Sequence, residues 1–395
     1  MKIAFLLASP DISGGTYVIF EHAIRMKKNG YDIYIVTEEC IDKERLNWHA
    51  ESKILNWLTF DEIKTINFDI AIATWWKTVF SIHKVNSKNY LYFVQSIESK
   101  FYPEYEVALK RLVESTYSIE LPVITEATWI KEYIEKIYPS NVYLAHNGIR
   151  KDIYNLNAIP IQKKEKEKLR VLVEGPLNVS FKNVEKTIEL CLKSKADEVW
   201  LLTSSDIKSY KGITRVFSKV PIQETAKIYS SCDVLVKLSY VEGMFGPPLE
   251  IFHCGGTAIV YDVTGHDEYI IHGKNGIVVA KDDEKNVINH INTLKKDANY
   301  LQLLKNGAIE TASNWIDWET SSELFKTNIE LISRKYSDSP KRIEKLTNFH
   351  MLNYIEFENF IKKNYKLSIV KTLHNIKEKI KIKYPKLFSI LKKLT

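Results

Sequence analysis

Short apolar runs alternate with longer stretches of helical periodicity along the N-terminal part of the chain. The run at 2–8 predicts a buried strand, and a helical pattern at about 16–28 ends before Gly30. Further strands are predicted at 32–37, 68–74, 89–95, 121–125 and 141–145. Because strands that alternate with helices pair in parallel through right-handed crossovers, this part is predicted to be a doubly wound α/β domain.

The same alternation returns after a charged stretch at 159–168, which lacks apolar periodicity and suits an exposed linker. Strands are then predicted at 170–174, 198–203, 214–217, 234–238 and 257–261. We therefore expect one Rossmann-like domain at 1–160 and a second at 161–335. Two such domains would face each other across a cleft at the carboxyl ends of their strands, where open parallel sheets bind ligands.

Residues 336–395 are predicted to form a helical appendage, because a helical spacing at 349–394 is broken only at Pro385. Residues 362–395 hold eleven lysines and one acid, Glu378, and so carry +10 of a chain whose total is +7. The rest of the chain therefore carries −3. A body that is not basic argues against a protein that neutralises duplex phosphates along a whole face.

Aliphatic residues recur at helical spacing between the lysines of this tail: Leu373, Ile376, Ile380, Leu387, Ile390, Leu391 and Leu394. A basic amphipathic helix favours the surface of an anionic membrane. Two alternatives stay open, namely a helix that packs on the protein body with a solvated lysine face, and a tail that binds nucleic acid. No apolar run reaches the roughly 18 residues of a spanning helix, so any membrane contact is expected to be peripheral.

Composition supports a folded chain in a reducing compartment. Hydrophobic residues make up 45% and charged residues 27% of the 395 residues, which is typical of globular proteins. The four cysteines form no C-x-x-C pair and have no histidine at metal-ligand spacing. The N-terminal apolar run is too short for a signal peptide, so we expect a cytoplasmic protein.

Adjacent glycines, Gly14 and Gly15, stand in the first strand-to-helix connection. Small residues there would let an anion approach the free N–H groups at a helix start, although a tight turn without a ligand is an equal alternative. A dinucleotide fingerprint would need G-x-G-x-x-G, and only Glu38 matches the position of a ribose-binding acid. The NAD interpretation is therefore disfavoured.

A more specific pattern follows the predicted strand at 234–238, where Glu242 and Glu250 flank a Gly-x-x-Gly-Pro-Pro turn. This spacing predicts one acid on the loop and the other in the first turn of a helix, with unpaired N–H groups near Gly246. Such a turn offers donors to a diphosphate while the acids accept hydrogen bonds from sugar hydroxyls. Plain compensation of the helix dipole is the alternative for Glu250.

The spacing from Glu242 to Glu250 resembles the E-x7-E element of retaining glycosyltransferases with the GT-B fold, in the group usually numbered family four. Other elements of that family stand in the same order along the chain: Gly14-Gly15, His146-Asn147-Gly148-Ile149, Lys182-Asn183-Val184, Tyr229 to Asp233, and Gly265 with Gly276. The segment from Tyr92 to Pro103 is similar to rhamnan- and O-antigen-type rhamnosyltransferases. The resemblance covers most of the chain.

The resemblance implies a role for each matching residue. Glu250 would bind the nucleotide ribose, and Glu242 would contact donor-sugar hydroxyls near the reacting carbon. Met244, Phe245 and Gly246 would line the sugar and the β-phosphate. Lys182 would neutralise the diphosphate leaving group, a role that suits its point charge.

One position departs from this pattern, because many relatives carry arginine directly after the glycine that corresponds to Gly175 and this chain has Pro176. Either Lys182 acts alone, or another cation such as Arg215 or Lys219 reaches the diphosphate. This departure also keeps a second hypothesis open, in which the chain is a catalytically weak glycan-binding or scaffolding subunit of a polysaccharide-synthesis complex.

On the acceptor side, Gln95, Glu98 and Tyr102 follow a predicted strand on the edge that faces the cleft. Glu98 could orient the acceptor hydroxyl or take its proton, or it could be a solvated loop acid. His22 and His146 are interpreted as core or cap residues. The adjacent Trp75 and Trp76 could stack on a sugar or belong to the core.

These observations predict an enzyme that moves a sugar, with retention, from a nucleotide-sugar donor to a growing cell-surface polysaccharide or lipid-linked glycan. No D-x-D motif is present to hold a metal ion, and no cofactor is expected beyond the donor, for which dTDP-rhamnose is our first candidate on the resemblance. The expected location is the inner face of the cell membrane. A nucleic-acid-associated protein would instead bind oligonucleotides in a salt-sensitive way through the tail.

Overall fold

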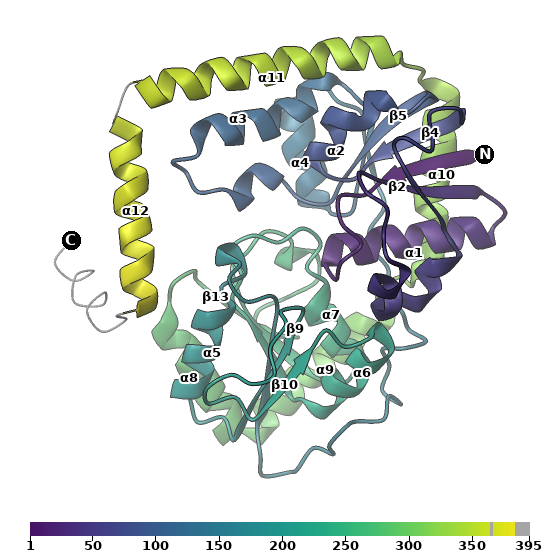
Figure 1. The fold of residues 1–395 in the computed structure, drawn as a ribbon. Coiled ribbons are helices and arrows are strands. Elements are labelled where there is room, and N and C mark those ends of the chain that lie inside the picture. Colours follow the sequence, from purple (N-terminus) through teal and green to yellow (C-terminus); the bar gives the residue numbers. More distant parts are fainter. Residues whose placement is uncertain (364–365, 384–395) are drawn as a thin grey trace.

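The computed structural model describes residues 1–363 and 366–383, which form two doubly wound domains followed by two further helices (Figure 1). Each domain is a parallel sheet covered by helices on both faces (Figure 1). The expected α/β fold class is therefore confirmed, including the pair of Rossmann-like domains and the C-terminal helical part.

The first sheet has seven strands in the order β3-β2-β1-β4-β5-β6-β7, and every pair is parallel. Its strands are β1 (Lys2–Leu6), β2 (Asp32–Thr37), β3 (Asn56–Thr59), β4 (Phe68–Ala73), β5 (Ser87–Val94), β6 (Val123–Thr125) and β7 (Val142–Leu144). In β1 the residues from Ile3 to Leu6 are all 0% exposed, which explains their unbroken apolar run. The five later strands expected in this domain are confirmed, and β3 was missed.

Helices cover both faces of this sheet. They are α1 (Gly14–Lys28), α2 (Trp76–Ser81), α3 (Val107–Ser115) and α4 (Thr128–Ile137), with 3₁₀ segments η1 (Lys43–Ile54), η2 (Ile82–Lys84), η3 (Glu98–Phe101) and η4 (Thr116–Ile119). Ser13 caps α1 by accepting from the Thr16 backbone N–H at 3.0 Å. Gly14 and Gly15 therefore belong to the first turn of α1 and not to the loop before it.

The second sheet has six strands in the order β10-β9-β8-β11-β12-β13, again all parallel. The strands are β8 (Arg170–Glu174), β9 (Glu198–Thr203), β10 (Arg215–Ser218), β11 (Val234–Lys237), β12 (Thr257–Tyr261) and β13 (Ile277–Val279). The connecting elements are η5 (Ser180–Lys182), α5 (Val184–Lys193), α6 (Ile222–Ser231), α7 (Gly246–His253), η6 (His266–Glu268), α8 (Glu284–Lys296) and α9 (Ala298–Asn314). All five expected strands are confirmed, and β13 was missed.

The next helix, α10 (Trp318–Lys335), returns to the first domain. Phe325 stacks on His22 at 4.1 Å between ring centroids and lies in one core cluster with Phe5 and Phe93 of the first sheet. The range 161–335 expected for the second domain therefore includes a helix that packs elsewhere. Its apolar face predicts a helix but does not say which domain covers it.

Two helices complete the described chain, α11 (Pro340–Lys363) and α12 (Lys366–Lys383). Helix α11 lies along the first domain and packs on α2 and α3, whereas α12 turns away and runs toward the second domain (Figure 1). Lys371 of α12 pairs with Glu106 at 2.7 Å. Pro385 and the tail positions from Leu387 to Leu394 lie outside the described residues. Among the residues that are described, no helix is long and apolar enough to cross a bilayer.

Candidate active site

The loop that follows β11 lies between the two domains and touches residues at the carboxyl ends of strands in the first sheet. Met244 donates its backbone N–H to Glu126 Oε1 at 3.0 Å, and Trp129 Nε1 donates to the Gly243 carbonyl at 3.0 Å. A Cβ atom on Gly243 would lie 2.0 Å from the Gln95 carbonyl oxygen, so no larger residue fits this contact. The carboxyl edges of both sheets therefore meet at this loop, as expected.

Glu242, in the middle of this loop, is buried between two ammonium groups. Lys182 Nζ lies 2.8 Å from Glu242 Oε2, and Lys237 Nζ lies 3.8 Å from Glu242 Oε1. Burial by itself would raise the pKa of Glu242, but the charges of Lys182 and Lys237 outweigh it and lower the pKa below its usual value. The structure thus brings together Glu242 and Lys182, which the sequence placed on separate elements.

Glu250 lies farther along α7 than the sequence suggested. It follows Pro247, Pro248 and Leu249 and so stands in the second turn of the helix, too far from the N-terminus for dipole compensation. Burial, with a smaller effect of Glu174, raises the pKa of Glu250 to about 7, while Tyr229 acts in the opposite direction. Burial therefore favours the protonated form of Glu250.

The N-terminus of α7 offers fewer free donors than expected. Gly246 donates its N–H to the Met244 carbonyl at 2.9 Å, and Pro247 and Pro248 have no N–H. A diphosphate would therefore depend on side-chain cations here rather than on backbone donors. The side chains of Met244 and Phe245 are buried, and a Cβ on Gly246 would meet no atom within 4 Å, so this backbone is open to a ligand.

The glycines of α1 lie at the same junction. A Cβ on Gly15 would lie 3.4 Å from the Gln95 side-chain amide, whereas a Cβ on Gly14 would meet no atom within 4 Å. Gln95 thus packs on Gly15 through its side chain and on Gly243 through its backbone. Among the described residues, neither Gln95 Oε1 nor Glu242 Oε1 has a hydrogen-bond donor, although both atoms are buried.

Glu98 is a buried acid, which rejects the alternative of a solvated loop residue. Its Oε2 accepts from the Trp76 backbone N–H at 2.7 Å and from the Tyr92 hydroxyl at 3.0 Å. Burial raises the pKa of Glu98 to about 8, against the two hydrogen bonds. Tyr102 is half-buried nearby and accepts from Trp76 Nε1 at 3.1 Å.

The remaining candidates divide between packing and contact across the domains. Trp76 is buried and His22 lies in the core, so both packing interpretations are confirmed, whereas Trp75 is half-buried. His146 Nε2 lies 3.0 Å from Glu268 Oε2, which joins the first domain to η6. This contact between domains was not foreseen.

Arg215 and Lys219 were suggested in place of the arginine that relatives carry at the position of Pro176, but both have other partners. The Arg215 guanidinium lies over the Trp200 ring, and Lys219 pairs with Asp206 at 3.1 Å. The nearby cation that the sequence analysis missed is Lys237, whose Nζ would lie 3.6 Å from a Cβ on Gly175. The sequence signal that could have identified Lys237 was a single lysine at the end of an apolar strand.

Sequence analysis also missed Glu126, a first-domain acid that holds the loop after β11. Its Oε2 accepts from Asn147 Nδ2 at 2.8 Å, while Oε1 accepts from Met244. Burial raises the pKa of Glu126 to about 7, against the hydrogen bonds from Met244 and Asn147. Only the fold brings this residue to the second domain.

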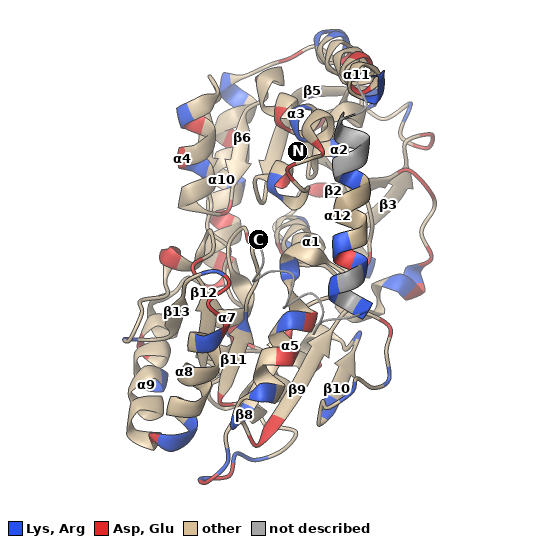
Figure 2. Cartoon of the chain, turned by 90° about the vertical axis from the view of Figure 1, so that its left-hand side faces the viewer, with Lys and Arg blue, Asp and Glu red and all other residues tan. Residues whose placement is uncertain are grey.

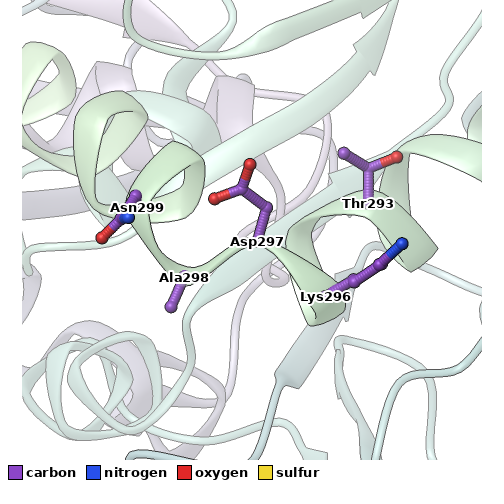
Figure 3. Close-up of a pocket in the computed structure, with 5 residues that line it drawn as sticks. All are labelled: Thr293, Lys296, Asp297, Ala298 and Asn299. Atoms are coloured by element: carbon purple, nitrogen blue, oxygen red, sulfur yellow. The ribbon is translucent and has the colours of Figure 1, made fainter.

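Elsewhere on the second domain, the junction of α8 and α9 forms a shallow hollow lined by Thr293, Lys296, Asp297, Ala298 and Asn299 (Figure 3). It lies on the outer side of that domain and contains none of the predicted site residues. Within the described part of the chain, no three His, Cys, Asp or Glu side chains gather as metal ligands would.

Comparisons with known proteins agree with this geometry. Residues 154–311 match the family model of glycosyl transferases group 1. No curated protein sequence matches the chain. Several hundred solved chains match this one. The sequence identities of those described below are low, so the likeness shows a shared fold.

Three of these structures illustrate the extent of the match. Sucrose-phosphate synthase from Thermosynechococcus elongatus has a TM-score of 0.69 at 15% identity, over 85% of this chain and all of that one. HepE from Anabaena, solved in complex with UDP and glucose, has a TM-score of 0.66 at 15% identity, over 84% of this chain and all of its own. The lipopolysaccharide outer core galactosyltransferase WaaB has a TM-score of 0.59 at 15% identity, over 84% of this chain and 99% of its own.

The family match lies on the domain that carries Lys182, Glu242 and Glu250, and the fold match extends over both domains. The second domain is thus similar to glycosyl transferases group 1, and the fold of the two domains is that of GT-B glycosyltransferase structures.

Proposed function

We propose that the chain transfers a sugar from a nucleotide-sugar donor to an acceptor hydroxyl, with retention at the anomeric carbon. The observation that carries this proposal is the pair of buried oxygens, Gln95 Oε1 and Glu242 Oε1, which have no donor among the described residues. Buried acceptors are rarely left unpaired, and a sugar supplies several hydroxyl donors at once. One oxygen comes from each domain, so a ligand between them would satisfy both.

Lys182 supplies the cation for the leaving group in this proposal. Its side chain is 24% exposed, so it can turn from Glu242 toward a diphosphate. Glu242 would accept from sugar hydroxyls, and Glu250 would accept from the ribose. Gly14 and Gly246 leave open backbone on opposite domains, where the ligand can approach.

The reaction itself depends on placement and charge. The acceptor oxygen forms its bond to the anomeric carbon on the face from which the diphosphate departs, and the acceptor proton passes to the departing phosphate oxygen. Holding the reactants in line and stabilising the leaving charge are the main catalytic contributions. We assign Glu98 and Tyr102 to the acceptor side, where Glu98 orients the acceptor hydroxyl.

Donor identity is tested by a binding panel. The resemblance to rhamnosyltransferases favours dTDP-rhamnose, whereas HepE was solved with UDP-glucose, so UDP sugars are the competing class. Thermal shifts with UDP, GDP and dTDP sugars should single out one base. A chain that no nucleotide sugar stabilises would contradict the proposed function.

The roles of the two acids are tested by comparing their variants. Glu250→Ala should weaken nucleotide binding, while Glu242→Ala should lower turnover more than nucleotide affinity, because one acid touches ribose and the other the sugar. Equal losses of free-nucleotide affinity in both variants would reject this assignment. If Glu242→Ala leaves donor hydrolysis unchanged while glycan binding is present, the scaffolding alternative is favoured.

The acceptor is proposed to be a polysaccharide or lipid-linked glycan at the cytoplasmic face of a membrane. The outward face of α11 carries four large apolar side chains that are 47% to 62% exposed: Phe349, Leu352, Ile355 and Phe360. The opposite face packs on the first domain through buried Ile343. Lysines also mark α12 (Figure 2). Exposed apolar rows beside positive charge fit an anionic bilayer.

The proposed membrane contact therefore includes α11 in addition to the apolar stripe of the tail. Leu373 and Ile376 of α12 are 59% and 47% exposed, so these two do not pack on the body. We expect Phe349→Ser combined with Leu352→Ser to reduce cosedimentation with phosphatidylglycerol vesicles. Leu303→Ser on α9 is the matched control, since Leu303 is 53% exposed on the other domain.

Deleting residues 364–395 removes nine lysines and one glutamate and should weaken vesicle binding further, mostly at low salt. Both changes should leave transfer to a soluble acceptor intact. Unchanged vesicle binding in both variants would reject the membrane proposal.

A further inference from the structure

Lys237 is a buried cation at the end of an apolar strand. It is the last residue of β11, between β8 and β12 in the second sheet, and its side chain is 3% exposed. The three strand residues before it, Val234, Leu235 and Val236, are all 0% exposed. An ammonium group in such a place requires charged partners.

Glu174 is the partner that fixes this ammonium. It ends the neighbouring strand β8, and its Oε2 accepts from Lys237 Nζ at 2.6 Å while its carbonyl accepts at 3.2 Å. Gly175 follows directly at φ +139°, a backbone conformation that favours glycine, and a Cβ there would lie 2.9 Å from Val184 Cγ2. Both the carboxylate and the backbone carbonyl of Glu174 therefore hold Lys237, which has little freedom to move.

Glu242 consequently has two cations of different character. Lys182 faces Oε2 from η5 at 2.8 Å and is 24% exposed, whereas Lys237 faces Oε1 from β11 at 3.8 Å and is enclosed. A cation that is partly in solvent can follow an arriving anion. A cation enclosed by the sheet cannot.

We propose that Lys237 is a positioning residue, a fixed countercharge that keeps Glu242 ionised and oriented when Lys182 turns to the diphosphate of the donor. This inference rests on the proposed function. It also accounts for a buried lysine that touches neither of the open backbone positions, Gly14 and Gly246. Lys237 thus acts through Glu242, not by contact with the donor.

Other acids of this region show what happens without a second cation. Burial raises the pKa of both Glu126 and Glu250 to about 7, although each accepts hydrogen bonds. For Glu242 the same burial is outweighed by Lys182 first and Lys237 second, and its pKa is lowered. With Lys182 withdrawn and Lys237 absent, Glu242 would resemble the other two acids.

The groups that act on Glu242 come from several elements. They are Lys182 at the end of η5, Lys237 on β11, Ser239 just after β11, Glu126 after β6, and Tyr269 after η6. Glu174 on β8 acts through Lys237. Lys182 and Lys237 are the positive groups in this set.

The first test measures the pH profile of donor hydrolysis. We compare the wild type with Lys237→Met combined with Glu174→Gln, a pair that leaves no unpaired carboxylate. The acid limb of kcat should move upward by at least about one pH unit, which is a tenfold loss of rate for each unit below the new limb. Affinity for the free nucleoside diphosphate should stay within about threefold, because Lys237 does not touch it.

Two controls separate this effect from a structural one. Lys193→Met removes a lysine on α5 that is 56% exposed and should leave the profile unchanged. Glu242→Gln should lower the rate and abolish this acid limb, because glutamine has no carboxyl group to titrate. A uniform loss of rate at every pH in the Lys237 variant would overturn the proposal, and so would a large loss of nucleotide affinity.

A second readout does not depend on activity. In Lys182→Met, which imitates the withdrawn lysine, infrared difference spectra of the carboxyl groups should show Glu242 ionised at pH 6.5. Adding Lys237→Met and Glu174→Gln should produce a protonated Glu242 band, assigned by its loss in Glu242→Gln. An ionised Glu242 in that combined variant would overturn the inference. If the wild type instead hydrolyses no nucleotide sugar while the spectra behave as expected, the proposed function fails and this electrostatic role stands.

Discussion

Replacing Glu98 by glutamine tests whether this acid is neutral inside the first domain. The change keeps an oxygen that can accept from the Trp76 N–H and the Tyr92 hydroxyl, and it removes the titrating proton. Burial raises the pKa of Glu98 to about 8 from the usual 4.5. Between these values the folded protein keeps its proton and the unfolded chain loses it.

The sign of the effect follows from this difference. Where the folded state binds more protons, stability falls as pH rises, by about 1.4 kcal/mol per pH unit for one group. The contribution of Glu98 is therefore fully present below pH 4.5 and is lost as pH rises toward 8. From pH 5 to 7 the wild type should lose on the order of 2 to 3 kcal/mol relative to Glu98→Gln.

The assay is thermal unfolding of both proteins, followed by tryptophan fluorescence at half-unit steps from pH 5 to 8.5. For a domain of this size, about 1 kcal/mol shifts the midpoint by roughly 2 to 4 °C, so the advantage of the variant should grow by several degrees. Glu132→Gln, which changes an exposed acid on α4, is the control and should track the wild type. A constant difference between Glu98→Gln and the wild type across this range would refute a neutral Glu98.

Two further predictions concern the junction of the domains. Lys182→Ala should lower kcat by about 10² or more if Lys182 is the main cation on the leaving group, and steady-state hydrolysis measures this directly. An unchanged rate would assign the role to another residue. Gly243→Ala should separate the domains, since its Cβ would lie 2.0 Å from the Gln95 carbonyl, and small-angle scattering should show a larger radius of gyration. Gly14→Ala is the control, because Gly14 lies at the same junction but its Cβ would meet no atom within 4 Å, and an unchanged radius for Gly243→Ala would refute the steric argument.

The parallel sheets could be predicted because their strands are buried on both faces and read as continuous apolar runs. β3 was missed because three of its four residues are only half-buried and form no continuous apolar run, and β13 was missed because its three residues directly follow Gly276. The return of helix α10 to the first domain depends on the contact of Phe325 with His22, a long-range contact that no local pattern encodes.

The residues of the candidate site could also be predicted only in part. The E-x7-E spacing and Lys182 identify second-domain residues, because one loop and its flanking elements hold them. Glu126 could not be found, since its contact with Met244 joins residues from different domains. The expected free N–H groups near Gly246 were wrong for a local reason, because Gly246 bonds to Met244 and two prolines follow it.

The most direct test of glycosyl transfer at this junction is product analysis by NMR. Wild type and Glu242→Gln are incubated with the nucleotide sugar selected by thermal shift and with an acceptor glycan. We predict release of the nucleoside diphosphate by the wild type, a new glycosidic bond whose anomeric configuration equals that of the donor, and loss of both in Glu242→Gln. A product of inverted configuration, or equal turnover by Glu242→Gln, would contradict the account.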